Sequence, residues 1–422
     1  MLRQVRRNMC SLLSREAVSS PSASPPPPPP RHPHPSAFPL SYQWCVVGAG
    51  PAGIAAVGLL LDSSVPPSSL LWIDPAFSVG DFGTRWRYVS SNTNVGLFLR
   101  FYQRCRSFHF PFQSSSNNSC TYAIEELPET QTCLLDVAAE PLRDITRTLR
   151  QTVRSLVGEV SQLREKDAKW ECVLSFSDGD ASSFLANNVV LATGAVPRSL
   201  FLHNAYPCIE EIPITTALNP SALVASVSAD DTVAIFGSSH SAIILIRTLL
   251  EHSSAKKVIN FYREPLKYAL YMGDWILFDD TGLKGDTARW SRDNLHGVPP
   301  ERLVRVYSDD KSLAEYLPLC SKVIYATGFE RREVPKGVLG LPPHYTYNSH
   351  CGIIAPGLFG CGIGYPEHKT DRYGNTEMRV GLWKFMQYLE SVIPLWKEYS
   401  VSKGIGQPKG ALAPKIANGN PA

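Results

Sequence analysis

Residues 43–62 read QWCVVGAGPAGIAAVGLLLD, and the architecture of the chain follows from them. The first part, Trp44 to Val47, is a short apolar run typical of a strand buried on both faces of a parallel sheet. Three glycines follow as G-x-G-x-x-G, at Gly48, Gly50 and Gly53. The first permits a sharp turn, the second lets backbone approach a pyrophosphate, and the third lets a helix pack close to its strand. This pattern predicts a strand-turn-helix unit that binds a dinucleotide.

The helix of this unit is expected to begin at about Pro51 and Ala52. The N–H groups of a first turn have no partner within the helix, so a proline, which has no N–H group, is tolerated there. The remaining free N–H groups and the positive end of the helix dipole make an anion site. The next apolar run, Leu70 to Ile73, ends in Asp74, 26 positions after Gly48. An acid near this spacing accepts hydrogen bonds from an adenosine ribose. The alternative is a structural βαβ unit without a ligand.

Length and composition describe a globular chain of more than one domain. At 422 residues, with 44% hydrophobic and 19% charged residues, two domains are expected. No apolar run approaches the roughly 18 residues of a membrane-spanning helix, so no transmembrane segment is predicted. Residues 1–40 carry five arginines and one acid, a net charge of +4. Because the whole chain has a net charge of +3, the remaining residues carry −1. A nearly neutral body offers no basic surface to a nucleic acid, which is therefore not expected as a partner.

Cysteine and histidine spacing argues against two other classes of protein. Ten cysteines are scattered along the chain without a C-x-x-C pair. The chain therefore lacks the dithiol through which disulfide reductases pass electrons onward. Neither H-E-x-x-H nor a Cys/His quartet occurs, so no metal site is predicted.

Both ends of the chain are predicted to lie outside the folded domains. Residues 1–20 combine arginines and serines with interleaved Leu and Val, which predicts an organellar transit peptide for mitochondria or plastids. A disordered tail on a cytoplasmic protein is the alternative. The prolines between Pro25 and Pro39 form a linker that cannot join a sheet, so folding is expected to start near Ser41. Residues 401–422, rich in Gly, Pro, Ala and Lys, are expected to fray.

A second strand-turn-helix cycle starts at residue 231. Residues 231–250 read DTVAIFGSSHSAIILIRTLL, and the following strand, Val258 to Tyr262, ends at Arg263. A cation in this position suits the 2′-phosphate of NADP, whereas a carboxylate would repel it. The turn residues expected at the cofactor are Gly237, Ser238, Ser239, His240 and Ser241. Ser239 stands where a second glycine would be ideal, and His240 is expected to cap the helix rather than to act in catalysis. The alternative is a structural second unit in which Arg263 is a solvated charge.

Two predicted buried strands end in the same tripeptide, A-T-G. It occurs at 192–194 and again at 326–328, so Thr193, Gly194, Thr327 and Gly328 are expected beside bound cofactors. Paired units with paired A-T-G returns predict an α/β fold of two Rossmann-like doubly wound dinucleotide-binding domains, the second inserted into a discontinuous first. The expected boundaries are 1–40 for the N-terminal segment, 41–212 and 321–400 for the first domain, 213–320 for the inserted domain and 401–422 for the tail.

Further elements are predicted between and after these units. Residues 141–156 are expected to form a helix with Pro141 in its first turn, and residues 377–393 an amphipathic helix. Residues 170–185 are expected to form a β-hairpin around S-D-G-D. The segments that join the two domains, about 197–213 and 323–328, are expected to act as a hinge.

In the order of these motifs, residues 43–398 resemble the two-dinucleotide-binding-domain flavoprotein oxidoreductases, in particular the flavin-containing and N-hydroxylating monooxygenases. The elements that carry the resemblance are G-A-G-P-A-G at 48–53, G-x-x-W-R at 83–87, N-T at 92–93, A-T-G at 192–194, G-S-S-H-S-A at 237–242 and A-T-G-F at 326–329. The resemblance implies FAD in the first domain and NADPH in the second. It also implies that Trp86 and Asn92 lie in the flavin pocket, with Asn92 beside the isoalloxazine, and that the Gly-rich run around Gly362 approaches the flavin.

The activity implied by the resemblance is transfer of one oxygen atom, from a flavin 4a-peroxide to a small nucleophilic nitrogen or sulfur substrate, with NADPH as reductant. Such chemistry requires positioning and exclusion of water, so no acid–base triad is needed, and Asn92 is the one catalytic residue expected. One alternative is an FAD and NAD(P)H dehydrogenase or reductase without oxygen transfer. Another is a non-enzymatic flavin-binding redox sensor or interaction protein. The preference for NADPH over NADH, the substrate's identity and the oligomeric state stay open.

Overall fold

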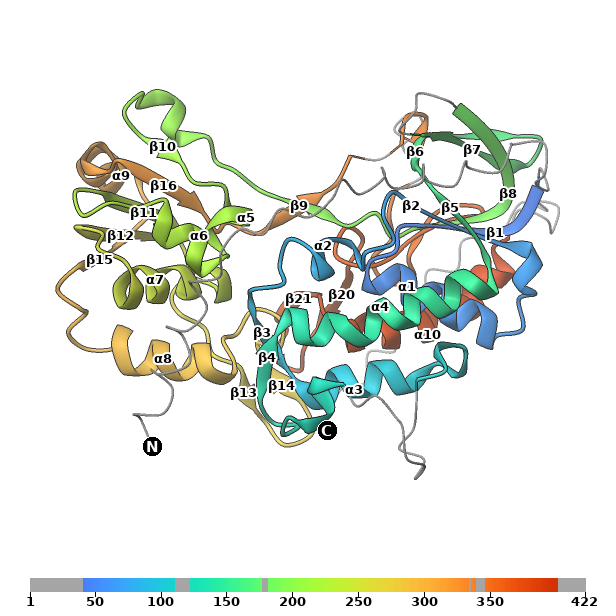
Figure 1. The fold of residues 1–422 in the computed structure, drawn as a ribbon, viewed down its shortest axis with the longest axis horizontal. Coiled ribbons are helices and arrows are strands. Elements are labelled where there is room, and N and C mark those ends of the chain that lie inside the picture. Colours follow the sequence, from blue (N-terminus) through green and yellow to red (C-terminus); the bar gives the residue numbers. More distant parts are fainter. Residues whose placement is uncertain (1–40, 111–121, 177–180, 334, 339–345, 401–422) are drawn as a thin grey trace, which may run out of the picture. The chain divides into compact units, whose positions relative to one another are not determined.

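Two separate sheets organise the chain (Figure 1). The computed structural model describes residues 41–110, 122–176, 181–333, 335–338 and 346–400. The predictions for residues 1–40 and 401–422, and for the S-D-G-D turn of the hairpin, therefore concern residues outside this set. Among the described residues, no helix is both long enough and apolar enough to span a bilayer.

The first sheet is mainly parallel and contains the opening strand-turn-helix unit. Its strand order is β18-β19-β8-β1-β2-β5, with bounds Ile353–Ala355, Leu358–Gly360, Ala181–Leu191, Ser41–Val47, Leu70–Asp74 and Arg154–Val157. Strand β1 lies in parallel register with β2 on one side and with β8 on the other. The predicted hairpin is present, since β7 (Lys169–Ser175) pairs antiparallel with β8, and β6 (Glu159–Lys166) extends it.

Helices and aromatic packing join the two ends of the chain in this first layer. Its helices are α1, α2, α3, α4 and α10, with bounds Pro51–Asp62, Gly80–Gly83, Val95–Arg104, Leu135–Thr152 and Leu382–Glu398. Helix α1 packs on both α4 and α10. Phe359 of β19 stacks on Trp44 of β1 at 5.9 Å and on Trp396 of α10 at 4.8 Å. Segments more than 300 residues apart therefore share one core.

The second sheet is entirely parallel. Its order is β10-β16-β11-β12-β15, with bounds Glu210–Glu211, Lys322–Tyr325, Thr232–Phe236, Lys257–Tyr262 and Leu303–Tyr307. The accompanying helices α5 to α9 span Ile214–Ala217, Pro220–Ala225, His240–His252, Gly285–Leu295 and Asp310–Tyr316. The sheet thus runs from residue 210 to residue 325 and lies in sequence between β8 and β19 of the first sheet.

The two connections between the sheets run antiparallel to each other. Strand β9 (Ala195–Pro197) pairs with β17 (Phe329–Arg331). Arg198 extends the pairing, because its N–H donates to Gly328 O at 3.0 Å and its carbonyl accepts from Thr327 Oγ1 at 2.7 Å. Each A-T-G therefore leads into this two-stranded ribbon. Its action as a hinge stays a prediction.

Short antiparallel strand pairs and turns complete the described structure. The antiparallel pairs are β3 with β4, β13 with β14 and β20 with β21, with bounds Ser90–Asn94 and Thr132–Leu134, Leu270–Tyr271 and Ile276–Leu277, and Glu367–Thr370 and Thr376–Arg379. Single 3-10 turns occur at Pro67–Ser69, Arg106–Phe108, Ala123–Glu126, Leu202–Ala205 and Leu317–Leu319.

The predicted bounds of two helices are wrong. Helix α4 begins six residues before Pro141, which lies inside the helix, and Leu156 belongs to β5. Buried Ala138 continues the apolar face across the proline, so packing outweighs the preference of proline for a first turn. Residues 376–379 form strand β21 instead of the start of a helix, and α10 follows Gly381, whose φ of +147° lies in a region that favours glycine.

The two glycine turns repeat one backbone geometry. Gly48 has φ +109°, and a Cβ built there would overlap the carbonyl of Ala192, whose carbon lies 2.9 Å away. Gly237 has φ +126°, and its Cβ would overlap the carbonyl of Ala326, with the carbon at 3.1 Å. In both units the turn therefore crosses directly over the alanine of A-T-G. This contact explains why the glycine turn and the tripeptide occur as a pair.

Replacing Gly48 tests this contact. In ligand-free protein, Gly48→Ala is expected to lower the free energy of unfolding by about 1–3 kcal/mol, because alanine is strained at positive φ and has no space. Gly50→Ala is the matched control: Gly50 has φ −73° and nothing within 4 Å of a built Cβ. Its unfolding free energy in urea should stay within about 0.5 kcal/mol of wild type. Equal losses in the two variants would contradict the close-approach account.

Candidate active site

The larger cavity, of about 730 Å³, lies at the carboxyl ends of β1, β2 and β8. This volume falls within the roughly 300–1,000 Å³ of ligand pockets. Of the residues predicted for the first cofactor, those that line it are Gly48, Gly50, Pro51, Asp74, Trp86, Asn92, Thr193 and Gly194. The other three support its wall. A Cβ on Gly53 would overlap the Gly48 carbonyl, and one on Gly362 would come within 2.7 Å of Ala52 Cβ.

The glycine turn forms an anion-binding end of this cavity. Helix α1 starts after Gly50 without a side-chain cap, so its first-turn N–H groups remain for a ligand. Gly50 leaves free space where a Cβ would stand. The buried hydroxyl of Thr193 also has no hydrogen-bond partner within the described part of the chain. A Cβ at position 50 would fill the space beside these free donors. Because Gly50 leaves it open, the space fits the pyrophosphate of a dinucleotide.

Asp74 ties the glycine turn to the end of β2. Its carboxylate is buried and accepts hydrogen bonds from the backbone N–H groups of Ala49 at 2.7 Å, Ala76 at 2.8 Å and Phe77 at 2.6 Å. A carboxylate offers about four acceptor positions, so one stays available for a ribose hydroxyl. Asp74 therefore has a structural role, in fixing the turn, that the sequence did not reveal. Its position also suits the predicted role of binding a ribose hydroxyl.

An ion-pair cluster in the same cavity was missed from the sequence. Arg332 Nη2 donates to Asp81 Oδ2 at 2.9 Å, and Arg85 Nε lies 3.5 Å from Asp81 Oδ1. The buried Nε of Arg332 has no partner among the residues described. These side chains come from α2, the loop after it and the residue following β17. The only signal in the sequence was their nearness to G-x-x-W-R and A-T-G-F.

Another part of the cavity wall contains aromatic side chains and the start of a helix. Trp86 packs edge-on against Phe329 at 5.7 Å. Gly381 and Leu382, where α10 begins, also line the cavity, and α10 has no side-chain cap. The positive end of this helix dipole therefore faces the cavity, five residues later in the chain than predicted.

Asn92 lines the cavity and also joins β3 to the segment before α8. Its Nδ2 donates to Gly282 O at 3.0 Å, and its Oδ1 accepts from the N–H of Lys284 at 2.9 Å. A carboxamide has two N–H donors, so the second remains for a ligand. Asn92 is thus oriented by two backbone hydrogen bonds.

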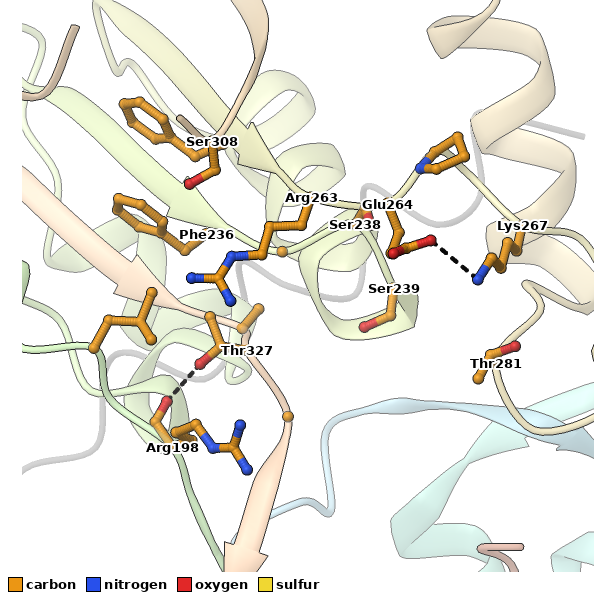
Figure 2. Close-up of a pocket in the computed structure, with 16 residues that line it drawn as sticks. Arg198, Phe236, Ser238, Ser239, Arg263, Glu264, Lys267, Thr281, Ser308 and Thr327 are labelled. Atoms are coloured by element: carbon orange, nitrogen blue, oxygen red, sulfur yellow. Dashed lines mark hydrogen bonds and ion pairs between the residues drawn. The ribbon is translucent and has the colours of Figure 1, made fainter. Parts of the chain in front are cut away.

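The smaller cavity, of about 340 Å³, lies at the second glycine turn (Figure 2). The predicted residues that line it are Gly237, Ser238, Ser239, Arg263, Thr327 and Gly328. It also contains Arg198 from the connecting ribbon and Lys267, whose Nζ lies 3.2 Å from Glu264. Three cations against one carboxylate make this cavity positive, which suits a phosphorylated ligand.

Ser239 does not disturb the turn. Its φ of −91° and ψ of −174° match the −73° and 177° of Gly50, and any residue adopts this extended conformation. The Ser239 hydroxyl does not cap α7, so it stays available to a ligand. The missing second glycine is therefore compatible with a dinucleotide turn.

His240 has a different role from the predicted one. Ser239 is the N-cap residue of α7 and no side chain caps this helix, so the expected histidine cap is wrong. Nε2 of His240 lies 2.7 Å from Ser90 O, and because a carbonyl only accepts, this nitrogen carries the proton. Burial lowers the pKa of His240, against a smaller raising effect of the Ser90 hydrogen bond. His240 and Ser241 do not line the smaller cavity.

No protein-family model matches the chain. The chain is 33% identical over 380 residues to "Monooxygenase AgnR1" of Paecilomyces divaricatus, covering 83% of this chain and 97% of that protein. Among solved structures, a flavin-containing monooxygenase from Stenotrophomonas maltophilia matches with TM-score 0.55 and 16% identity over 85% of this chain and 99% of that one. An ornithine N-hydroxylase from Kutzneria sp. 744 matches with TM-score 0.56 and 12% identity over 85% and 99%.

Tandem glycine turns on two parallel sheets, each beside a cavity that suits a nucleotide, define a two-dinucleotide-binding-domain flavoprotein fold. The chain belongs to the flavin-dependent monooxygenases and is an oxidoreductase. The resemblance inferred from its motifs is thereby confirmed. The non-enzymatic alternative does not describe this protein.

Acid titration tests the environment of His240. Because burial lowers its pKa in the folded protein, the neutral form is favoured there, and stability is lost as pH falls below the unfolded value of about 6.5. His240→Gln keeps an N–H donor for Ser90 but does not titrate. Its unfolding free energy in urea should therefore fall less than that of wild type between pH 7.5 and 5.5. A difference between the two proteins that is constant across this range would contradict the assigned environment.

Proposed function

We propose that this chain binds FAD in the larger cavity and NADPH in the smaller one, and oxygenates a small compound at a nucleophilic nitrogen or sulfur. The observation that carries the proposal is the repeated turn geometry with opposite charges at the following strand end, Asp74 in one unit and Arg263 in the other. A carboxylate suits free ribose hydroxyls, and a guanidinium suits a 2′-phosphate. Overall, NADPH, a proton, O2 and substrate give NADP⁺, water and the oxygenated product.

Residues of the larger cavity would hold FAD, which when bound supplies the redox chemistry and the reaction with O2. Gly50 and the start of α1 would bind its pyrophosphate, and Asp74 its ribose. Trp86 and the first residues of α10 would form the wall at the ring end. The uncapped end of α10 would favour negative charge there.

Residues of the smaller cavity would hold NADPH. Arg263 follows directly after β12 and lines the cavity with Ser238 and Ser239 (Figure 2). Its planar guanidinium would bind the 2′-phosphate through two parallel hydrogen bonds. The turn serines and the start of α7 would bind the pyrophosphate.

Asn92 is the proposed catalytic residue. Two backbone hydrogen bonds hold its carboxamide, and its second N–H would donate into the cavity. A preorganised donor stabilises negative charge that develops during reaction, since it needs no reorganisation at that moment. Hydrophobic neighbours such as Phe385 and Leu382 would exclude water.

We also propose, from composition alone, that residues 1–20 direct import into mitochondria.

Cofactor preference is tested with Arg263. Purified protein should carry FAD, and anaerobic NADPH should bleach its absorbance. Arg263→Ala should weaken NADPH binding about 10-fold or more, because a charged hydrogen-bonded contact of some 1.5–3 kcal/mol is lost. NADH binding should change less than about 2-fold. Stopped-flow titration of the reduction rate gives both constants, and equal effects on the two nucleotides would refute the 2′-phosphate assignment.

The role of Asn92 is tested by the coupling of NADPH use to product. Asn92→Ala should raise the share of consumed NADPH that ends as hydrogen peroxide, because the charge-stabilising donor is gone. Hydrogen peroxide and NADPH oxidation are measured together with thioanisole as sulfur substrate. The FAD content of the variant is measured in parallel. An unchanged peroxide share at full FAD content would remove Asn92 from catalysis.

A further inference from the structure

Strand β3 is held at two points by the part of the chain that builds the second sheet. Ser90 O accepts from His240 Nε2 at 2.7 Å. Two residues further along β3, the Asn92 carboxamide bonds the backbone of Gly282 and Lys284. These contacts join residues 150, 190 and 192 positions apart.

Each contact lies next to a wall of one of the two cavities. His240 follows Ser239, which lines the smaller cavity, and Gly282 follows Thr281, which lines it as well. Asn92 itself lines the larger cavity, as does Ser91. One five-residue strand therefore connects the smaller cavity's glycine turn to the wall of the larger cavity.

The segment bonded to Asn92 is itself immobilised. Glu377 accepts from the backbone N–H groups of Asp280 at 3.2 Å and Thr281 at 3.1 Å. Lys384 Nζ lies 2.8 Å from carboxylate oxygens of both Asp279 and Asp280. Glu377 belongs to β21 and Lys384 to α10, which begins at the larger cavity. The segment that Asn92 contacts is thus itself bonded to β21 and α10. The start of α7, by contrast, reaches β3 through His240.

His240 supplies the link between β3 and the start of α7. Its Nε2–H makes the one side-chain bond between the start of α7 and β3 that the described residues show. Its Nδ1 is buried and has no hydrogen-bond partner among them. The His240 side chain therefore contributes one oriented donor to β3 and does not line the smaller cavity.

We propose that His240 is a positioning residue, which holds the second glycine turn against Ser90 so that the hydride donor lies within reach of its acceptor. This inference rests on the proposed binding of NADPH in the smaller cavity. Hydride transfer needs reacting atoms about 3–3.5 Å apart, and a misplacement of about 1 Å can cost 10²-fold in rate. Loss of His240 should therefore slow the transfer while leaving nucleotide affinity nearly unchanged.

The experiment compares His240→Ala and His240→Gln with wild-type holoenzyme. Anaerobic stopped-flow mixing with NADPH gives the limiting rate of flavin reduction and the dissociation constant separately. We expect a limiting rate about 10-fold or more lower in His240→Ala, with a dissociation constant within about 3-fold of wild type. His240→Gln should restore most of the rate, because its amide N–H can reach Ser90 O.

Two measurements independent of turnover accompany the kinetics. NADP⁺ binding to FAD-free protein by calorimetry should be alike in all variants. The difference spectrum of the oxidised flavin on addition of NADP⁺ should be smaller in His240→Ala and recover in His240→Gln. His252→Ala, at the exposed end of the same helix, is the matched control and should behave as wild type.

Three outcomes would overturn the proposal: an unchanged limiting rate in His240→Ala, a higher dissociation constant at an unchanged rate, or failure of glutamine to restore the rate. Should His240→Ala lose FAD or unfold, His240→Leu, which fills the volume without a donor, takes its place in the same comparison. A wild-type flavin that NADPH does not reduce would instead refute the proposed function, before any variant is compared.

Discussion

The structure depends on the contact between a glycine and the carbonyl of an alanine at the end of a neighbouring strand. It occurs twice, at Gly48 over Ala192 and at Gly237 over Ala326. At each position a Cβ would overlap backbone, which cannot move without opening the sheet. The contact therefore sets where each helix starts relative to the strand ends, and with that the place where free N–H groups meet a cavity. Both cavities are consequences of this constraint.

Charge then distinguishes two sites that share one backbone plan. In the larger cavity, Asp74 spends three of its acceptor positions on backbone N–H groups, which fixes the turn as well as its own orientation. In the smaller cavity, Arg263 and Lys267 make the surroundings positive. Opposite charges at equivalent strand ends favour two different nucleotides at the two sites.

The connection between these sites is made by side chains that bond to backbone. Asn92 and His240 both do so, and neither interaction contributes much to stability alone, since a single hydrogen bond is worth about 1 kcal/mol. Their importance lies in orientation, because reacting atoms must lie about 3–3.5 Å apart and a misplacement of about 1 Å can cost 10²-fold in rate. The stacked rings of Trp44, Phe359 and Trp396 supply the complementary rigidity in the first core.

Local sequence determined the buried strands beside the two glycine turns, the turns themselves, their order and the opposite charges after them, because each is encoded by residues that are neighbours along the chain. Only the tertiary structure decided that α4 begins ahead of Pro141, that Arg332 meets Asp81 251 positions away, and that His240 bonds Ser90 instead of capping its helix. Such contacts have no periodicity and no fixed spacing. They arise when the two sheets and the connecting ribbon bring distant segments of backbone close to a side chain. A buried backbone N–H or C=O group then needs a hydrogen-bond partner, and the nearby side chain supplies it.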